Sequence, residues 1–143
     1  MKMARPWCSA ILSLAGCGAE PLCSSDVIRV ARDIGSDRYA VTATRDCGAT
    51  TDYATILRIG RASEPQSAAS EVFVADSNHG AAAEGPEGAI WLKVVWTAPG
   101  QLSVAYDSRA RVFKHVLDAK GARSATKRVI RTYGFKCCGW QVL

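Results

Sequence analysis

Short runs of alternating apolar and polar residues, separated by turn residues, constrain the fold of this chain more than any other feature. In residues 90–96 the apolar side chains at positions 90, 92, 94 and 96 share one face of an extended strand, because successive side chains of a strand point to opposite faces. Pro99-Gly100 then supplies a turn, and residues 102–106 repeat the alternation. This order predicts a β-hairpin.

The same pattern recurs along most of the chain. Residues 39–44 alternate after the turn signal Gly35-Ser36-Asp37, as in a half-buried strand, with Tyr39, Val41 and Ala43 on one face. Further short apolar runs lie at residues 53–59, 72–74, 112–116 and 129–133. We therefore expect an all-β fold: a small single domain over residues 26–133, built as an antiparallel sheet, meander or sandwich of about 6–8 strands.

The first residues have the order of an export signal. Lys2 and Arg5 provide positive charge, a short apolar stretch follows, and Leu14-Ala15-Gly16-Cys17 ends it. This arrangement resembles a bacterial lipoprotein signal, in which the cysteine sulfur is acylated and the chain is cut just before it. The resemblance implies a signal peptide at residues 1–16, a lipidated Cys17 and a tether at residues 17–25. The alternative is an ordinary N-terminal strand or helix of a cytosolic protein.

Acylation of Cys17 would decide where the protein resides. Each buried CH₂ contributes about 0.8 kcal/mol to membrane attachment, and more than one acyl chain makes the attachment stable. Gly18 follows the cysteine, in place of the aspartate that is usually linked to inner-membrane retention. The resemblance therefore implies a lipid-anchored protein of the cell envelope, at the outer membrane and facing the periplasm. The membrane itself is then the first expected partner.

The cysteine content agrees with an oxidising compartment. If Cys8 is removed with the leader and Cys17 is acylated, four thiols remain: Cys23, Cys47, Cys137 and Cys138. Four thiols allow three pairings. A bridge between Cys23 and Cys47 would contribute roughly 3–3.5 kcal/mol by chain entropy, whereas the two adjacent cysteines could pair with each other or elsewhere. The spacing does not match the C-x₂₋₄-C pattern of zinc sites, so no metal site is expected.

Charge is divided unevenly along the chain. Residues 17–108 carry 12 acidic and 7 basic side chains, whereas residues 109–143 carry 1 acidic and 9 basic side chains. The basic segment could dock on an anionic cell-wall or lipid surface, or on an acidic envelope protein. The alternative is a set of solvated terminal strands whose lysines and arginines prevent edge-to-edge aggregation. No nucleic-acid partner is expected for an exported chain.

Two loops carry the most distinctive polar residues, Asp46-Cys47-Gly48-Ala49-Thr50-Thr51-Asp52-Tyr53 and Asp76-Ser77-Asn78-His79-Gly80. Glycine permits close approach of another backbone or a ligand, and the hydroxyl and carboxylate groups offer polar contacts. The candidate binding surface comprises Asp46, Gly48, Thr50, Thr51, Asp52, Asp76, Asn78 and His79. The alternative for the first loop is a hairpin connection closed by a disulfide, with threonines bonding to local backbone.

A catalytic function has little support in the sequence. His79 with Asp76 or Asp46 could act as an acid–base pair in a periplasmic hydrolase, but such a site is defined by spatial geometry. A histidine beside Asn and Gly is more often a turn residue. No phosphate-binding loop, dinucleotide fingerprint, zinc-protease motif or nucleophile elbow is present, so no cofactor is expected.

Several of these motifs together resemble a family of small bacterial envelope proteins of uncharacterised function. The match runs from about residue 35 to residue 113 and rests on Cys47-Gly48-Ala49-Thr50-Thr51, the segment Val72–Gly80 and the tryptophan-bearing hairpin Trp96–Tyr106. Gly35-Ser36-Asp37 stands where the family usually has Ser-Pro-Asp-Gly. The resemblance implies export and a β fold, but no reaction. The cysteine-containing tail at residues 134–143 is not part of this resemblance.

These observations favour one function over two alternatives. We expect an uncharacterised lipoprotein, a lipid-anchored envelope module that binds a ligand or assists a partner and has no evident catalytic machinery. The first alternative is the hydrolase that uses His79. The second is a structural protein that docks on an anionic envelope surface through its basic C-terminal strands.

Overall fold

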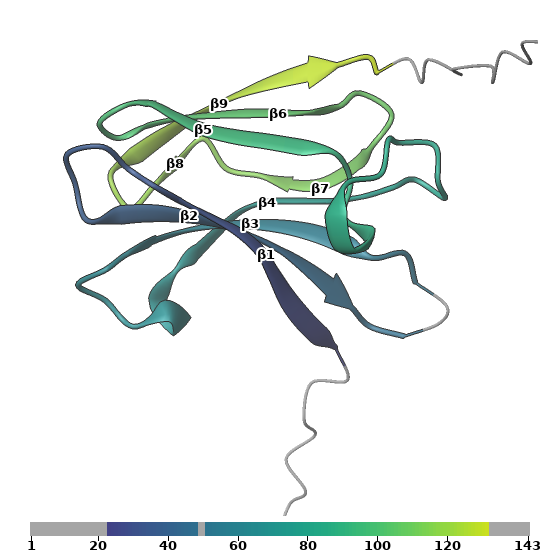
Figure 1. Ribbon diagram of the computed structural model, residues 1–143, viewed down its shortest axis with the longest axis horizontal. Helices are drawn as coiled ribbons and strands as arrows, with labels where there is room; N and C mark the ends of the chain where they lie inside the picture. Colours follow the sequence, from purple (N-terminus) through teal and green to yellow (C-terminus); the bar gives the residue numbers. More distant parts are fainter. Residues whose placement is uncertain (1–22, 49–50, 132–143) are drawn as a thin grey trace, which may run out of the picture.

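The part of the chain that the structure describes forms nine strands in two sheets that pack face to face (Figure 1). The computed structural model describes residues 23–48 and 51–131. The first sheet has the order β1-β2-β3-β4-β7 and comprises β1 (Ser24–Arg32), β2 (Arg38–Asp46), β3 (Ala54–Arg61), β4 (Ser70–Asp76) and β7 (Arg111–His115). The second has the order β5-β6-β9-β8 and comprises β5 (Leu92–Ala98), β6 (Gln101–Asp107), β9 (Ala122–Val129) and β8 (Asp118–Ala119).

Helix is almost absent from the part of the chain that the structure describes. Two single 3-10 turns, η1 (Gln66–Ala68) and η2 (Pro86–Gly88), lie in the loops before β4 and β5. Within residues 23–48 and 51–131, no helix has the length and apolar character that crossing a membrane requires. The expected all-β fold is thus confirmed, in the form of a sandwich.

The structure also corrects details of the expected fold. The second sheet is mixed, because β9 runs parallel to β6, so the sandwich is not wholly antiparallel. The strand expected at residues 129–133 instead spans Ala122–Val129, and β1 begins at Ser24, inside the expected tether. Strand β9 was missed because its sequence, Ala-Arg-Ser-Ala-Thr-Lys-Arg-Val, buries only small side chains and lacks the apolar alternation that marks the other strands.

The core lies between the two sheets. The expected hairpin is confirmed, since β5 and β6 pair antiparallel across the Pro99-Gly100 turn. Its inward side chains include Trp96 and Tyr106, and the centre of the Tyr106 ring lies 5.0 Å from the centre of the Phe73 ring on β4. Burial of apolar surface, which contributes about 25 cal/mol for each Å² removed from water, is the main stabilising contribution to the fold.

Strand β2 is buried on both faces, which differs from the half-buried strand expected. Ala40 turns toward the second sheet and is 1 % exposed, whereas Tyr39 and Ala43 lie on the opposite, outer face and are also buried. Tyr39 pairs with Gly60 of β3, and a Cβ atom at Gly60 would lie 2.5 Å from the tyrosine ring. The missing side chain of Gly60 thus creates the space in which Tyr39 packs.

Buried aspartates connect elements at the two ends of the sandwich. Asp33 follows β1 and accepts hydrogen bonds from the backbone N–H of Gly100 at 2.9 Å and from the Ser36 hydroxyl at 2.6 Å. This contact joins the β1–β2 turn of the first sheet to the β5–β6 turn of the second. Asp107, at the end of β6, accepts the backbone N–H of Ala83 at 3.0 Å and the Arg109 guanidinium at 2.7 Å.

These contacts lower the pKa of both carboxyl groups. Hydrogen bonds from the Arg109 side chain, together with the backbone N–H groups of Arg109 and Ala83, hold the pKa of Asp107 well below its usual range. Burial raises the pKa of Asp33, but the hydrogen bonds from Ser36, Gly100 and Arg38 outweigh it. A group whose pKa is lower in the folded state stabilises the fold above its unfolded pKa, and this stability is lost as the pH falls.

We expect Asp107→Asn to lower the free energy of unfolding by about 2–3 kcal/mol at pH 7, because the buried amide cannot replace both acceptor oxygens. We also expect the variant to lose less stability than the wild type between about pH 5 and pH 2. Urea unfolding at several pH values measures both effects. Asp118→Asn is the matched control, since Asp118 is exposed and forms a 3.4 Å ion pair with Arg123. Equal losses in the two variants would contradict a structural function for Asp107.

Candidate functional site

The two loops singled out in the sequence meet at one hollow of about 360 Å³, at the end of the first sheet where β2 and β4 end and β3 and β7 begin. The first loop contributes Cys47, Thr51 and Asp52, and the turn after β4 contributes His79. The walls are completed by side chains from β2, β3, β4 and β7: Arg45, Ala54, Asp76, Arg111 and Phe113. Of the expected binding surface, the structure brings Thr51, Asp52, Asp76 and His79 together here, whereas Asp46, Gly48 and Asn78 do not line the hollow.

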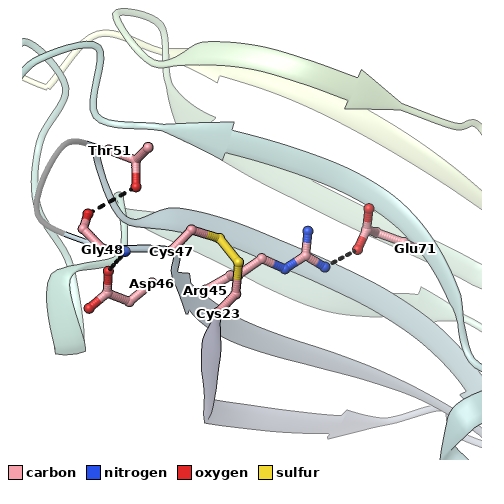
Figure 2. The surroundings of a disulfide bond; sticks show 7 residues. All are labelled: Cys23, Arg45, Asp46, Cys47, Gly48, Thr51 and Glu71. Atoms are coloured by element: carbon pink, nitrogen blue, oxygen red, sulfur yellow. Dashed lines mark hydrogen bonds and ion pairs between the residues drawn. A yellow bond between two sulfur atoms is a disulfide. The ribbon is translucent and has the colours of Figure 1, made fainter. Parts of the chain in front are cut away.

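A disulfide beside this hollow links the ends of the neighbouring strands β1 and β2. Cys23 and Cys47 are bonded, as expected, and the bond joins the residue before β1 to the residue after β2 (Figure 2). Next to it, Arg45 donates to the Glu71 carboxylate at 2.9 Å. The bridge prevents the antiparallel pair β1–β2 from opening at this end, where Ser24 pairs with Asp46. It thereby fixes the start of the first loop.

The turn that carries His79 has an unusual backbone. Asn78 and His79 have φ values of 51° and 58°, in the left-handed region, and Gly80 follows at 82°. Left-handed backbone costs a non-glycine residue roughly 1–2 kcal/mol. Side-chain oxygens accept the three backbone N–H groups of this turn, each at 2.9 Å. Asp76 accepts the N–H of Asn78, and Asp52 accepts the N–H of His79. The Ser77 hydroxyl accepts the N–H of Gly80. The Asp52–His79 bond ties the first loop to the second.

Charges in the hollow are paired. Arg111 of β7 donates to both carboxylate oxygens of Asp76. Burial raises the pKa of Asp76, but hydrogen bonds from Arg111 and from the N–H of Asn78 outweigh it, so the pKa is lowered. The same contact raises the pKa of Arg111. The Arg111 guanidinium also lies 5.1 Å from the centre of the Phe113 ring, which is 61 % exposed.

Other residues of the expected surface have local structural contacts. Asp46 accepts the N–H of Gly48 at 2.9 Å, and the Thr51 hydroxyl donates to the carbonyl of Gly48 at 3.1 Å. Local backbone bonding by a threonine, the alternative considered for this loop, is therefore present at Thr51. The Asn78 side chain donates to the carbonyl of Arg109 at 3.3 Å. Thr50 and Cys17, the expected lipidation site, lie outside the described residues, as do the leader and the tail.

Sequence reasoning missed the cationic and aromatic part of the hollow. Arg45 directly precedes the first loop, so its position was a usable signal. Arg111 and Phe113 alternate on β7, which reaches the hollow only because β7 pairs with β4, and Arg111 pairs with Asp76. The intervening strands β5 and β6 belong to the other sheet. A contact across such a crossover cannot be derived from spacing along the chain.

The geometry around His79 differs from that of the expected acid–base pair. The nearest carboxylate oxygen belongs to Asp52, 3.6 Å from Nδ1, rather than to Asp76 or Asp46. This distance exceeds that of a hydrogen bond. In residues 23–48 and 51–131, no hydroxyl or thiol is hydrogen-bonded to His79, and no three metal-ligating side chains cluster. The hydrolase alternative stays a prediction, and the described residues around His79 do not form an acid–base pair at hydrogen-bond distance.

Comparisons with known proteins identify no relative. No protein-family model matches the chain, and neither a curated protein nor a solved structure matches it. The resemblance to envelope proteins with a Cys-Gly-Ala-Thr-Thr motif therefore stays a prediction.

The backbone at His79 predicts an unusual order of stabilities. We expect His79→Gly to be at least as stable as the wild type, and His79→Ala to be less stable than His79→Gly by about 1 kcal/mol, because only glycine adopts this backbone without strain. Urea unfolding of the three proteins measures the order. At Thr97, an exposed strand residue, the glycine variant should instead be the less stable one. The same order at both positions would contradict the left-handed turn.

Proposed function

We propose that this protein is a lipid-anchored module of the bacterial cell envelope, which binds a neutral, hydroxyl-rich ligand such as a sugar unit in the hollow between its two loops. The observation that carries the proposal is the meeting of the loops. The hydrogen bond from the N–H of His79 to Asp52 connects them, and the disulfide fixes the start of the first loop. Strained backbone that the surrounding structure maintains is often associated with a binding or catalytic site.

The lining of the hollow supports this ligand class. Two guanidinium groups and two carboxylates, those of Arg45, Arg111, Asp52 and Asp76, give a lining without net charge. A ligand therefore needs no charge of its own, but it can hydrogen-bond to both donors and acceptors. The exposed ring of Phe113 offers an apolar surface on the rim. An apolar surface combined with a few oriented polar groups is typical of small-ligand sites.

Two features support the envelope location. The leader with Leu14-Ala15-Gly16-Cys17 resembles a lipoprotein signal, and the chain forms a disulfide between Cys23 and Cys47. Structural disulfides form and persist mainly in oxidising compartments outside the cytosol. A short tether to Cys17 would keep the hollow close to the membrane surface. Binding, rather than hydrolysis, is the better supported function because the carboxylate of Asp76 is engaged by Arg111.

An array of neutral oligosaccharides, probed with the full chain carrying Cys17→Ser, tests this proposal. The substitution removes the acylation site and leaves every described residue unchanged. We expect this protein to bind a defined subset of the oligosaccharides. Adding Phe113→Ala should reduce that binding at least tenfold, because the ring supplies the apolar contact.

Leu117→Ala is the matched control. Leu117 is 53 % exposed, similar to Phe113, but does not line the hollow. This variant should bind like the wild type. Absence of binding to any neutral oligosaccharide would overturn the proposed ligand class, and equal losses in the two variants would overturn the proposed site.

A further inference from the structure

The outer face of the second sheet carries the cations Lys93, Lys127 and Arg123, of which Arg123 pairs with the exposed carboxylate of Asp118 at 3.4 Å. Buried side chains such as Val94 and Val104 point to the core, so by alternation the intervening residues of β5, β6 and β9 point outward. Strand pairing arranges them in rows: Lys93, Ala105 and Lys127; Val95, Ser103 and Ala125; and, at the far end, Gln101 with Arg123. We call this surface, made of those eight residues, the basic face.

Its two lysines differ from most basic residues of the C-terminal segment. Arg111, Lys114 and Lys120 form ion pairs with carboxylates of the acidic part of the chain: Asp76, Glu71 and Glu64. Arg109 likewise pairs with Asp107. Neither Lys93 nor Lys127 forms an ion pair within residues 23–48 and 51–131. Arg123, at the far end of the basic face, pairs with the exposed Asp118. Within the described part of the chain, many cations of the basic segment are thus paired with carboxylates, whereas the two lysines of the basic face are not.

The cations are spread along a track. Lys93 and Lys127 are two strand spacings apart, roughly 10 Å, with the small side chain of Ala105 between them. Arg123 lies four residues before Lys127 on β9, about 13 Å along the strand. The side chains between the cations are small, so a chain-like ligand could lie against the sheet without displacing a bulky group.

One end of the track is hollowed. A hollow of about 570 Å³ lies there between the turns at Gly100 and Gly121. Its polar lining consists of hydroxyl, amide, guanidinium and carboxylate groups, from Ser36, Thr97, Ser103, Gln101, Arg38, Arg123 and Asp118. The β8–β9 turn at its rim has positive φ at Lys120 and Gly121, 52° and 71°, the backbone of a type I′ hairpin turn.

We infer that the basic face binds a linear acidic polysaccharide, with carboxylates of the ligand at Lys93 and Lys127 and its hydroxyl groups at the hollowed end, where Arg123 pairs with Asp118. Charge complementarity favours a polyanion, and the hydroxyl- and amide-lined hollow favours a sugar chain over a lipid head-group surface. A membrane-docking face would also need exposed large apolar side chains, and among the eight residues of the basic face the largest is Val95, 39 % exposed.

Binding of oligogalacturonate, a linear carboxylated polysaccharide, to the full chain with Cys17→Ser tests the inference by calorimetry. We expect binding that weakens with salt, because counterions are released from the polyanion. Lys93→Gln combined with Lys127→Gln should weaken it about tenfold or more. The slope of log affinity against log salt should also fall by about one for each lysine removed.

Arg29→Gln combined with Arg32→Gln is the matched control. These arginines are exposed on β1 in the other sheet and form no ion pair within residues 23–48 and 51–131. Both double variants remove two positive charges, so their net charges are the same. It should keep the wild-type affinity. An equal loss in both variants would overturn the basic face as the site.

Vesicles of phosphatidylglycerol and phosphatidylcholine distinguish the other anionic partner. Lysine-dependent binding to the vesicles without binding to oligogalacturonate would overturn the inference in favour of a membrane contact. If the protein binds neither oligogalacturonate nor the vesicles, the inference is overturned as well. None of these outcomes bears on the neutral-ligand hollow, whose residues are not changed.

Discussion

Two buried aspartates fix how the halves of this sandwich meet. Asp33 connects the β1–β2 turn to the β5–β6 turn, and Asp107 holds the loop that passes from the first sheet to the second. Apolar contact between two sheets is not directional, so it does not by itself select one register. The aspartates do so, because a buried acceptor has to meet its N–H partner in one position. Thr55 acts similarly by accepting the N–H of Ile90 at 2.8 Å.

This register also builds the hollow. The loop held by Asp107 begins with the left-handed turn at Asn78 and His79, and its other support is Asp52 in the first loop. The Cys23–Cys47 bond fixes the start of that first loop. Arg111 of β7 then pairs with Asp76 at the end of β4. Side chains far apart in sequence thus form one site because the sandwich fixes the positions of both loops and of β7.

The sequence predicts local features well and long-range pairing poorly. Alternation and turn residues predict the hairpin at Pro99-Gly100, because both signals lie within one short segment. The two loops were recognised by composition, and the disulfide was one of several pairings considered. Strand β9 was missed because its inward residues are Ala122 and Ser124, too small to mark a strand. Arg111 and Phe113 were missed because their neighbours belong to strands that are distant in sequence.

The uneven division of charge along the chain is also explained by contacts between segments that are distant in sequence. Acidic and basic segments attract each other across the sandwich, as in the pair between Lys120 and Glu64 at 2.6 Å. Composition alone suggests one broad basic surface, whereas the fold leaves only part of that charge unpaired. The basic face and the neutral hollow therefore present different chemistry to the surroundings.

Mass spectrometry of the protein purified from its native membrane tests the central claim, an acylated and disulfide-closed module outside the cytoplasm, most directly. We predict a mature N-terminus at Cys17 with the added mass of acyl chains, together with a linked pair of peptides that contain Cys23 and Cys47. An intact initiator methionine on a chain with reduced thiols would contradict the account.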